Sequence, residues 1–301
     1  MEILKLIISA DFLSSVIRVT TPILFATMAV LLSDRAGVVN ISIEGTMLVS
    51  ALMGVVGSAF TGSAWLGLLI AVASGVAFAG ILSFFHLKMK TDIILTGIAL
   101  NLLASGFTVF LLYILTGDKG VSTSLPSKVL PTINIPFVQD IPYIGKILSG
   151  QNVLTYMAIL SVIIIAVFLK RTRAGTYIRG AGENPSAIAT AGKNVTKIRL
   201  QALLISGALA GFGGAFMSMG YLSMFTKDMV AGRGFIALAA EAMGRGTPGL
   251  SMLSSFLFGF ADALSNNLQM FSIPSELTRI MPYLLTIICL AVYAARKNKK
   301  K

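Results

Sequence analysis

The feature that most constrains this chain is a series of long apolar runs that recurs from one end to the other. Each run has at least the roughly 17 residues that a helix needs to cross the hydrocarbon of a bilayer. The runs are continuous, whereas a membrane β-barrel would need alternating apolar and polar residues. The sequence therefore predicts an all-α, polytopic helical membrane protein. The expected spans cover about 12–32, 41–60, 66–86, 92–116, 153–169, 200–222, 250–270 and 279–295.

One further apolar stretch, residues 232–244, is too short for a straight span and ends at Arg245-Gly-Thr-Pro-Gly249. It predicts a broken or partly inserted helix, or a span completed by flanking residues. With it, the expected number of transmembrane segments is about nine. We expect residues 1–301 to form a single transmembrane domain.

The charged residues agree with a membrane location. They make up only 12% of the chain, about half the share found in soluble domains. The net charge of +12 comes mainly from loops and the C-terminus, which is typical of cytoplasmic flanks beside membrane lipid and does not indicate a nucleic-acid partner. The one cysteine, Cys289, excludes an intramolecular disulfide. Neither a metal-ligating cluster nor a catalytic set of His, Asp or Ser is present.

The basic residues also predict the orientation. The turn at Lys88 and Lys90, the loop 170–199 and the basic tail should all lie in the cytoplasm, so the C-terminus is cytoplasmic. Residues 117–152, rich in proline and with β-prone pieces such as Thr132–Ile135, then form an extracytoplasmic loop. This count places the N-terminus outside, whereas insertion of residues 2–10 as a hairpin with the first span would place it inside.

The loop 170–199 contains the pattern of a short helix with both ends marked. The Asn184 side chain can accept a backbone N–H of the first turn, and Pro185 suits the first helical position. Gly192 can adopt the left-handed conformation that ends a helix. A helix of about two turns does not persist alone in water. It is therefore either part of an ordinary cytoplasmic loop or a projection that inserts into a soluble partner.

Four separated stretches carry a resemblance to one family. They are Ser33-Asp-Arg-Ala-Gly-Val-Val-Asn-Ile-Ser-Ile-Glu-Gly45, the loop stretch Arg179–Val195 with Leu204–Ala215, Ala231–Ala240 and Phe258–Leu264. Together they resemble ABC importer permeases of the branch that serves branched-chain amino acids, simple sugars and nucleosides. The similarity is closest to nucleoside-uptake permease subunits, which implies the plasma membrane of a bacterium.

The resemblance implies several partners. In that family the loop helix docks into a cleft of an ATP-binding subunit, and the core contains a second permease subunit, identical or a paralogue. An extracellular substrate-binding lipoprotein delivers the solute. The chain lacks the G-x-x-x-x-G-K-[ST] phosphate loop, so we expect ATP to be bound and hydrolysed by the partner, with no cofactor in this chain. The expected coupling residues are Gly182, Glu183, Asn184, Pro185, Ala187 and Gly192.

Polar residues inside the apolar runs are candidates for the substrate pathway, because such residues are costly in a membrane. Amide and carboxylate groups can bind the hydroxyls and base edges of a nucleoside. The alternative for each is a hydrogen bond between helices, or for Glu44 an ion pair with Arg35. Glu241 stands where family members often carry an apolar residue. The candidates are Asn40, Glu44, Asn101, Glu241, Asp262 and Asn266.

The sequence thus predicts the permease subunit of an ATP-driven importer that moves a nucleoside-type solute into the cytoplasm by alternating access. One alternative is an ABC permease for a simple sugar. Another is an ion-coupled secondary carrier, in which Glu44, Glu241 and Asp262 would bind ions.

Overall fold

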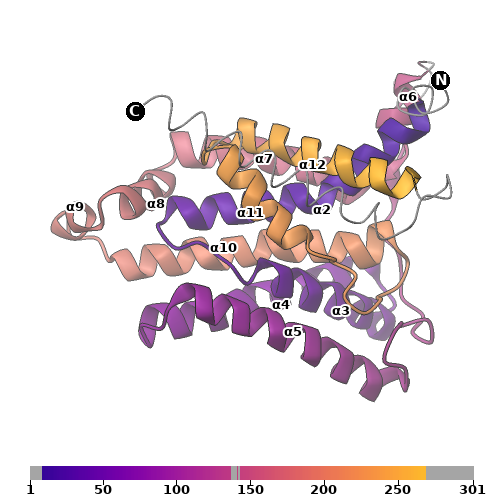
Figure 1. Ribbon diagram of the computed structural model, residues 1–301, viewed down its shortest axis with the longest axis horizontal. Coiled ribbons are helices and arrows are strands. Elements are labelled where there is room, and N and C mark those ends of the chain that lie inside the picture. The colour runs from indigo at the N-terminus through magenta and orange to yellow at the C-terminus, as the bar shows by residue number, and fades with distance from the viewer. Residues whose placement is uncertain (1–8, 137–140, 142, 269–301) are drawn as a thin grey trace.

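The computed structural model describes residues 9–136, 141 and 143–268, and shows an elongated bundle of long helices (Figure 1). Six helices in this part of the chain have the length and apolar composition to cross a membrane. They are α2 (Ala10–Arg35), α3 (Ile43–Thr61), α4 (Ala64–Ser83) with a π-helical turn (Phe84–Lys88), α5 (Ile93–Thr116), α7 (Val153–Arg171), and α10 (Val195–Phe216) with a second π-helical turn (Met217–Tyr221).

The prediction of a helical, polytopic membrane protein is confirmed at this level, with six such helices described against about nine expected. The expected run 250–270 corresponds to α12 (Pro248–Leu268). The expected run 279–295, the basic tail and residues 2–8 lie outside the described residues.

Helix α2 forms the centre of the bundle and packs against α10, α12, α11 and α7. Several of its hydroxyl groups are hydrogen-bonded to the backbone of the helix itself. The hydroxyls of Thr20 and Thr27 donate to the carbonyls of Val16 and Ile23, each at 2.7 Å. Polar groups buried among apolar helices are tolerated when they are hydrogen-bonded. Residues 19–33 of the helix can therefore stay buried while carrying Thr20 and Thr27.

The outer helices show the reverse pattern. On α5, Leu95, Leu102 and Phe110 are 70%, 72% and 62% exposed, respectively. Large apolar side chains in such numbers are stable on the outside of a bundle when lipid surrounds it. Inside, α4 and α10 approach closely at Gly75 and Gly207, where a Cβ atom on either residue would meet the other helix. This is the close packing that small residues allow between membrane helices.

The region 117–152 contains a small two-stranded sheet. Strand β1 (Thr132–Ile133) pairs antiparallel with β2 (Gln151–Asn152), and α6 (Ile144–Leu148) lies between them in sequence. The expected β-structure at Thr132–Ile135 is thus confirmed for its first two residues. Lys128 N donates to Ser58 Oγ at 3.2 Å, so this region packs on the end of α3.

Two short helices replace most of the expected loop 170–199. They are α8 (Arg173–Glu183) and α9 (Pro185–Thr190), and they project from one end of the bundle (Figure 1). The sequence predicted only α9. It also predicted a short helix at 232–244, which is α11 (Arg233–Met243) with 11 residues. At about 1.5 Å per residue, α11 spans only about half of a bilayer core.

Residues 36–42 do not form helix, although they follow the end of α2. They run back into the bundle, so that α3 begins partway along α10 (Figure 1). Asn40 hydrogen-bonds Ser206, which lies in the middle of α10. Non-helical backbone at this depth needs partners from neighbouring helices. These partners belong to the candidate site.

Candidate functional site

Helix α9 has the caps that its sequence predicts. Asn184 Oδ1 accepts the backbone N–H of Ala187 at 3.1 Å, and Pro185 occupies the first turn. Gly192 has φ +73°, and Lys193 N donates to Ile188 O at 3.1 Å to end the helix. Apart from the half-buried Ile188, which packs on α8, every residue of α9 is exposed. The chain therefore presents a preformed helix at the surface.

Helix α8 joins this projection to the bundle. A Cβ atom at Gly182 would collide with the carbonyl of Arg35 and with the backbone N of Gly37. Arg199, near the start of α10, donates from Nε to Ala36 O at 3.3 Å. The backbone of residues 35–37 is therefore enclosed between α8 and α10.

Residues 33–45, here called the 33–45 segment, continue from this contact into the bundle. Asn40 is fully buried, and its Nδ2 donates to Ser206 Oγ at 3.1 Å. Its Oδ1 accepts from the backbone N and the hydroxyl of Ser42 at 3.1 and 2.8 Å. Asn40 thus shapes the start of α3 and fastens it to α10.

Asn101, on α5, binds the same region from the other side. Its Oδ1 accepts from Gly45 N at 2.8 Å, and its Nδ2 donates to Ile41 O at 3.0 Å. The oxygen and the nitrogen of the Asn101 amide thus both bind backbone groups that have no hydrogen-bond partner within α3, because they lie at its start.

The 33–45 segment also binds both ends of α11. Glu44 Oε1 and Oε2 accept the backbone N–H groups of Gly232 and Gly234 at 2.7 and 2.8 Å. At the opposite end, Arg35 Nε donates to Gly246 O at 2.8 Å. An acid at the N-terminus and a base at the C-terminus complement the dipole of α11. The ion pair between Glu44 and Arg35 considered above is therefore wrong, because the two side chains bind opposite ends of this helix.

Asp262, on α12, forms an ion pair with Arg233 in the first turn of α11, at 2.8 Å. Both side chains are largely buried, at 12% exposure for Arg233 and 15% for Asp262. Arg233 Nη1 also donates to Val230 O at 3.2 Å. The pair fixes the start of α11 against α12.

The structure brings Asn40, Glu44 and Asn101 together around the start of α3, with Asp262 joined to them through the first turn of α11. Glu241 lies elsewhere, buried on α11 toward Gly246 and Arg35. Asn266 is exposed on α12 and belongs to neither group. The assignment of these six residues to a substrate pathway stays a prediction.

Sequence reasoning missed Arg233 and Ser206 as members of this network, and it assigned Arg35 the wrong partner. For Arg233, the available indication was a single charge among the small and apolar residues of Ala231–Ala240. Residues with positive φ flank α11 on both sides: Asp228, Ala231, Gly232, Arg245 and Gly246. Such positions set sharp changes of chain direction, so α11 is a short rigid unit between two turns.

A helical membrane bundle with an exposed capped helix, linked through buried polar contacts to an internal short helix, is the architecture of a transporter's membrane subunit. The comparison with protein families agrees, because the chain matches the family described as the branched-chain amino acid transport system / permease component over residues 12–290. The chain belongs to this family of ABC transporter permeases.

Several curated relatives are similar along most of their length. The guanosine ABC transporter permease protein NupQ of Bacillus subtilis is 33% identical, covering 100% of this chain and 95% of its own. The nucleoside ABC transporter permease protein NupC of Lactococcus lactis is also 33% identical, covering 92% and 90%. The putative glucose ABC transporter permease protein TsgC13 of Haloferax volcanii is 33% identical as well, covering 88% and 80%.

A solved structure, described as an inward-facing conformation of a putative metal-chelate type ABC transporter, shares the fold. The TM-score is 0.53 with 17% identity, and the match covers 93% of this chain and 84% of that one. At this identity the likeness concerns the fold alone.

Proposed function

We propose that this permease is the membrane subunit of an ATP-driven importer in a bacterial plasma membrane, and that it moves a nucleoside-type solute into the cytoplasm. The observation that carries the proposal is the capped, exposed helix α9, joined through α8 to the 33–45 segment. A helix of six residues with no buried side chain of its own gives the bundle little stability. Its fixed shape suits docking to a partner, which we take to be a separate ATP-binding subunit.

The contacts support a route for coupling. When the partner closes on ATP, α9 and α8 move together, and Gly182 passes the movement to Arg35 and Gly37. Arg35 binds the C-terminal end of α11, while Glu44 binds its N-terminal end. The 33–45 segment would then move α11 as a unit and open one side of the bundle. Such a switch requires only that the ATP-binding subunit bind the two conformations of the permease with different affinity.

For the solute, the relatives named for nucleosides or guanosine favour a nucleoside, and a simple sugar is the second candidate because of the relative named for glucose. The chain offers suitable groups at the entry to α11. Asp228 is exposed and accepts a hydrogen bond at 2.9 Å from the hydroxyl of the partly buried Ser105. Phe235, in the first turn of α11, is 48% exposed. A carboxylate and a hydroxyl suit ribose, and an aromatic ring can stack on a base.

The remaining parts follow from the proposed orientation. The end with α8 and α9 and the C-terminus face the cytoplasm, by the excess of lysine and arginine in the loops. Residues 117–152 then face outward, where a substrate-binding lipoprotein would dock. A second permease subunit, identical or a paralogue, completes the core.

The test is uptake of radiolabelled guanosine by proteoliposomes that contain the purified complex, with ATP inside or absent. Glu183→Trp, beside α9, should abolish ATP-driven uptake while the protein still inserts. Thr176→Trp, an exposed position on α8 away from α9, should transport normally. Native uptake by the Glu183 variant, or uptake driven by an ion gradient without the ATP-binding subunit, would contradict the proposal. Uptake of glucose in place of guanosine would favour the second candidate.

A further inference from the structure

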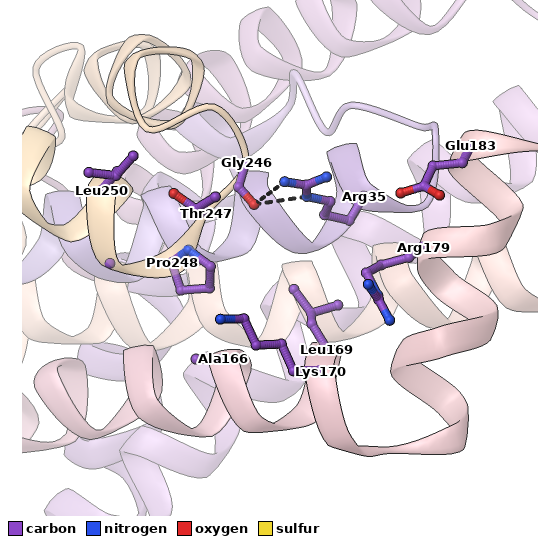
Figure 2. A pocket seen from close by; sticks show the side chains of 11 residues that line it. Arg35, Ala166, Leu169, Lys170, Arg179, Glu183, Gly246, Thr247, Pro248 and Leu250 are labelled. Atoms are coloured by element: carbon purple, nitrogen blue, oxygen red, sulfur yellow. Dashed lines mark hydrogen bonds between the residues drawn. The ribbon is translucent and has the colours of Figure 1, made fainter.

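A cavity of about 430 Å³ opens at the end of the bundle that carries α8 (Figure 2). It lies between the last turn of α7, helix α8 and the start of α12. This volume is in the range of about 300–1,000 Å³ that is typical of ligand pockets. The residues that matter for its chemistry are Arg35, Lys170, Arg179, Glu183, Pro248 and Leu250.

The cavity favours an anion. Three cationic side chains line it against one carboxylate, that of Glu183. The Nε atom of Arg179 is buried and has no hydrogen-bond partner among the described residues. Lys170 forms no ion pair within the same part of the chain, and Figure 2 shows its side chain extending toward Pro248. Unpaired basic groups that face a cavity are an incomplete binding site.

Helix α12 adds to this preference. It begins at Pro248, and Gly249 and Leu250 of its first turn line the cavity. The first amide groups of a helix have no intrahelical acceptor, and the helix dipole is positive there. The 21 residues of α12 therefore direct the positive end of their dipole at the same space as the Lys170 and Arg179 side chains.

One wall of the cavity is apolar and continues along the outside of the bundle. Ala166, Leu169 and Leu250 form this wall. Leu250, at 49% exposure, is followed along α12 by Leu253 at 65%, and Val167 on α7 is 52% exposed. Because Lys170 lies in the last turn of α7, the cavity is at the level where the hydrocarbon of the bilayer gives way to headgroups. The ligand should then combine a phosphate with an apolar chain.

We infer that this cavity binds an anionic phospholipid, with its phosphate against Lys170 and Arg179 and an acyl chain along Leu250. Basic pockets between membrane helices on the cytoplasmic side bind such headgroups. The bound lipid contacts α7, α8 and α12 together, and it therefore stabilises α8 in the position that holds Gly182 on the 33–45 segment.

The test is native mass spectrometry of the purified full chain titrated with phosphatidylglycerol. The double variant Lys170→Gln/Arg179→Gln removes both unpaired cations. Each basic residue near an anionic headgroup strengthens binding roughly fivefold, so the double variant should bind about 25-fold more weakly. The matched control, Arg173→Gln/Lys197→Gln, removes the same charge from exposed positions outside the cavity and should bind like the unsubstituted protein. Equal binding by all three proteins would overturn the inference.

Further measurements distinguish a lipid from other ligands. Phosphatidylcholine, whose headgroup has no net charge, should bind much more weakly than phosphatidylglycerol. Leu250→Ser should weaken the binding of phosphatidylglycerol but not the binding of inorganic phosphate. Inorganic phosphate that competes as well as phosphatidylglycerol would show a site for phosphate alone. If the double variant binds lipid normally but no longer binds the ATP-binding subunit, the cavity is a docking site for that subunit and not a lipid site. Either result would overturn the inference.

Discussion

At the scale of single residues, the Glu44 side chain holds the start of α11 against α3. Its two carboxylate oxygens each accept one backbone N–H, from Gly232 and Gly234. These amides begin a helix and have no other helical partner. Hydrogen bonds to a charged acceptor are stronger than neutral ones, so this one residue replaces the cap that Gly232 lacks.

We predict that Glu44→Ala leaves both amides unsatisfied and destabilises the protein by roughly 2–4 kcal/mol. Glu44→Gln keeps one accepting oxygen and should lose about half as much. The measurement is the midpoint of thermal unfolding in detergent at one fixed heating rate, because unfolding of such proteins is often irreversible. Equal midpoints for the alanine variant and the unsubstituted protein would show that the amides find other partners.

The buried pair of Arg233 and Asp262 gives a second prediction. Removing one partner leaves an uncompensated charge between helices, and Arg233→Met or Asp262→Leu should each cost about 2–4 kcal/mol. The double variant should recover part of this loss, because it leaves no unpaired charge. Arg233 also donates to the carbonyls of Met229 and Val230, so Arg233→Met should be the more damaging single change. Strictly additive losses in the same unfolding assay would argue against the pair.

The sequence could indicate which residues are unusual at this scale, but not what they bind. Asn40, Glu44, Asn101 and Asp262 stand out because they interrupt apolar runs. Glu44 and Asn101, however, bind backbone groups 188 and 56 residues away in the chain. Any residue type can supply a backbone amide, so no sequence pattern marks the partner. Only the packing of α3 against α5 and α11 brings these groups within reach.

At the scale of elements, α9 was predictable and α8 was not. The caps of α9 depend on local sequence, because Asn184, Pro185 and Gly192 affect only backbone groups a few residues away. Helix α8 contains Gly175, Gly180 and Gly182, and glycine disfavours a helix by about 1 kcal/mol relative to alanine. Two of these glycines meet neighbouring backbone, at Phe168 and at Arg35. Tertiary packing therefore explains a composition that, taken alone, predicts a loop.

We predict that Asn184→Ala loosens α9 without destabilising the bundle. Loss of an N-cap costs about 1 kcal/mol, so the amides of Ile188 and Ala191 should exchange with deuterium roughly fivefold faster. Asn184→Ser retains an accepting oxygen and should exchange nearly like the unsubstituted protein. The thermal midpoint should stay the same in both variants. A lower midpoint in Asn184→Ala would show that α9 contributes to the core after all.

At the scale of the whole molecule, the arrangement predicts that α9 and the region after α5 lie on opposite sides of the membrane. After replacement of Cys289 by serine, single cysteines at Thr190 and at Ser124, both exposed, can be tested in intact cells. A membrane-impermeant maleimide should label Ser124→Cys from outside and should label Thr190→Cys only after the cells are opened. Labelling of both in intact cells would contradict the proposed orientation.

Hydropathy was sufficient to predict the long helices, because each long apolar run is stable in lipid only as a helix. It did not show that α3 begins inside the bundle. The expected span 41–60 differs from α3 by only two residues at its start and one at its end. The sequence therefore predicts the length of α3, but it does not show how deep in the bundle the helix begins. The depth depends on contacts of Asn40 with Ser206 and of Asn101 with Gly45, which no local pattern contains.

The inward path of residues 36–42 has a consequence for how the protein is made. A ribosome delivers α2 and this stretch to the membrane long before it has synthesised α5 and α10. Until then, the carbonyls of Ala36 and Ile41 lack Arg199 and Asn101, the donors that satisfy them in the finished fold. Backbone groups without hydrogen-bond partners are not stable in hydrocarbon, so residues 36–42 remain at the membrane–water interface until these donors are present. Its entry into the bundle is then a late step of biogenesis, and it takes place only once α10 has emerged.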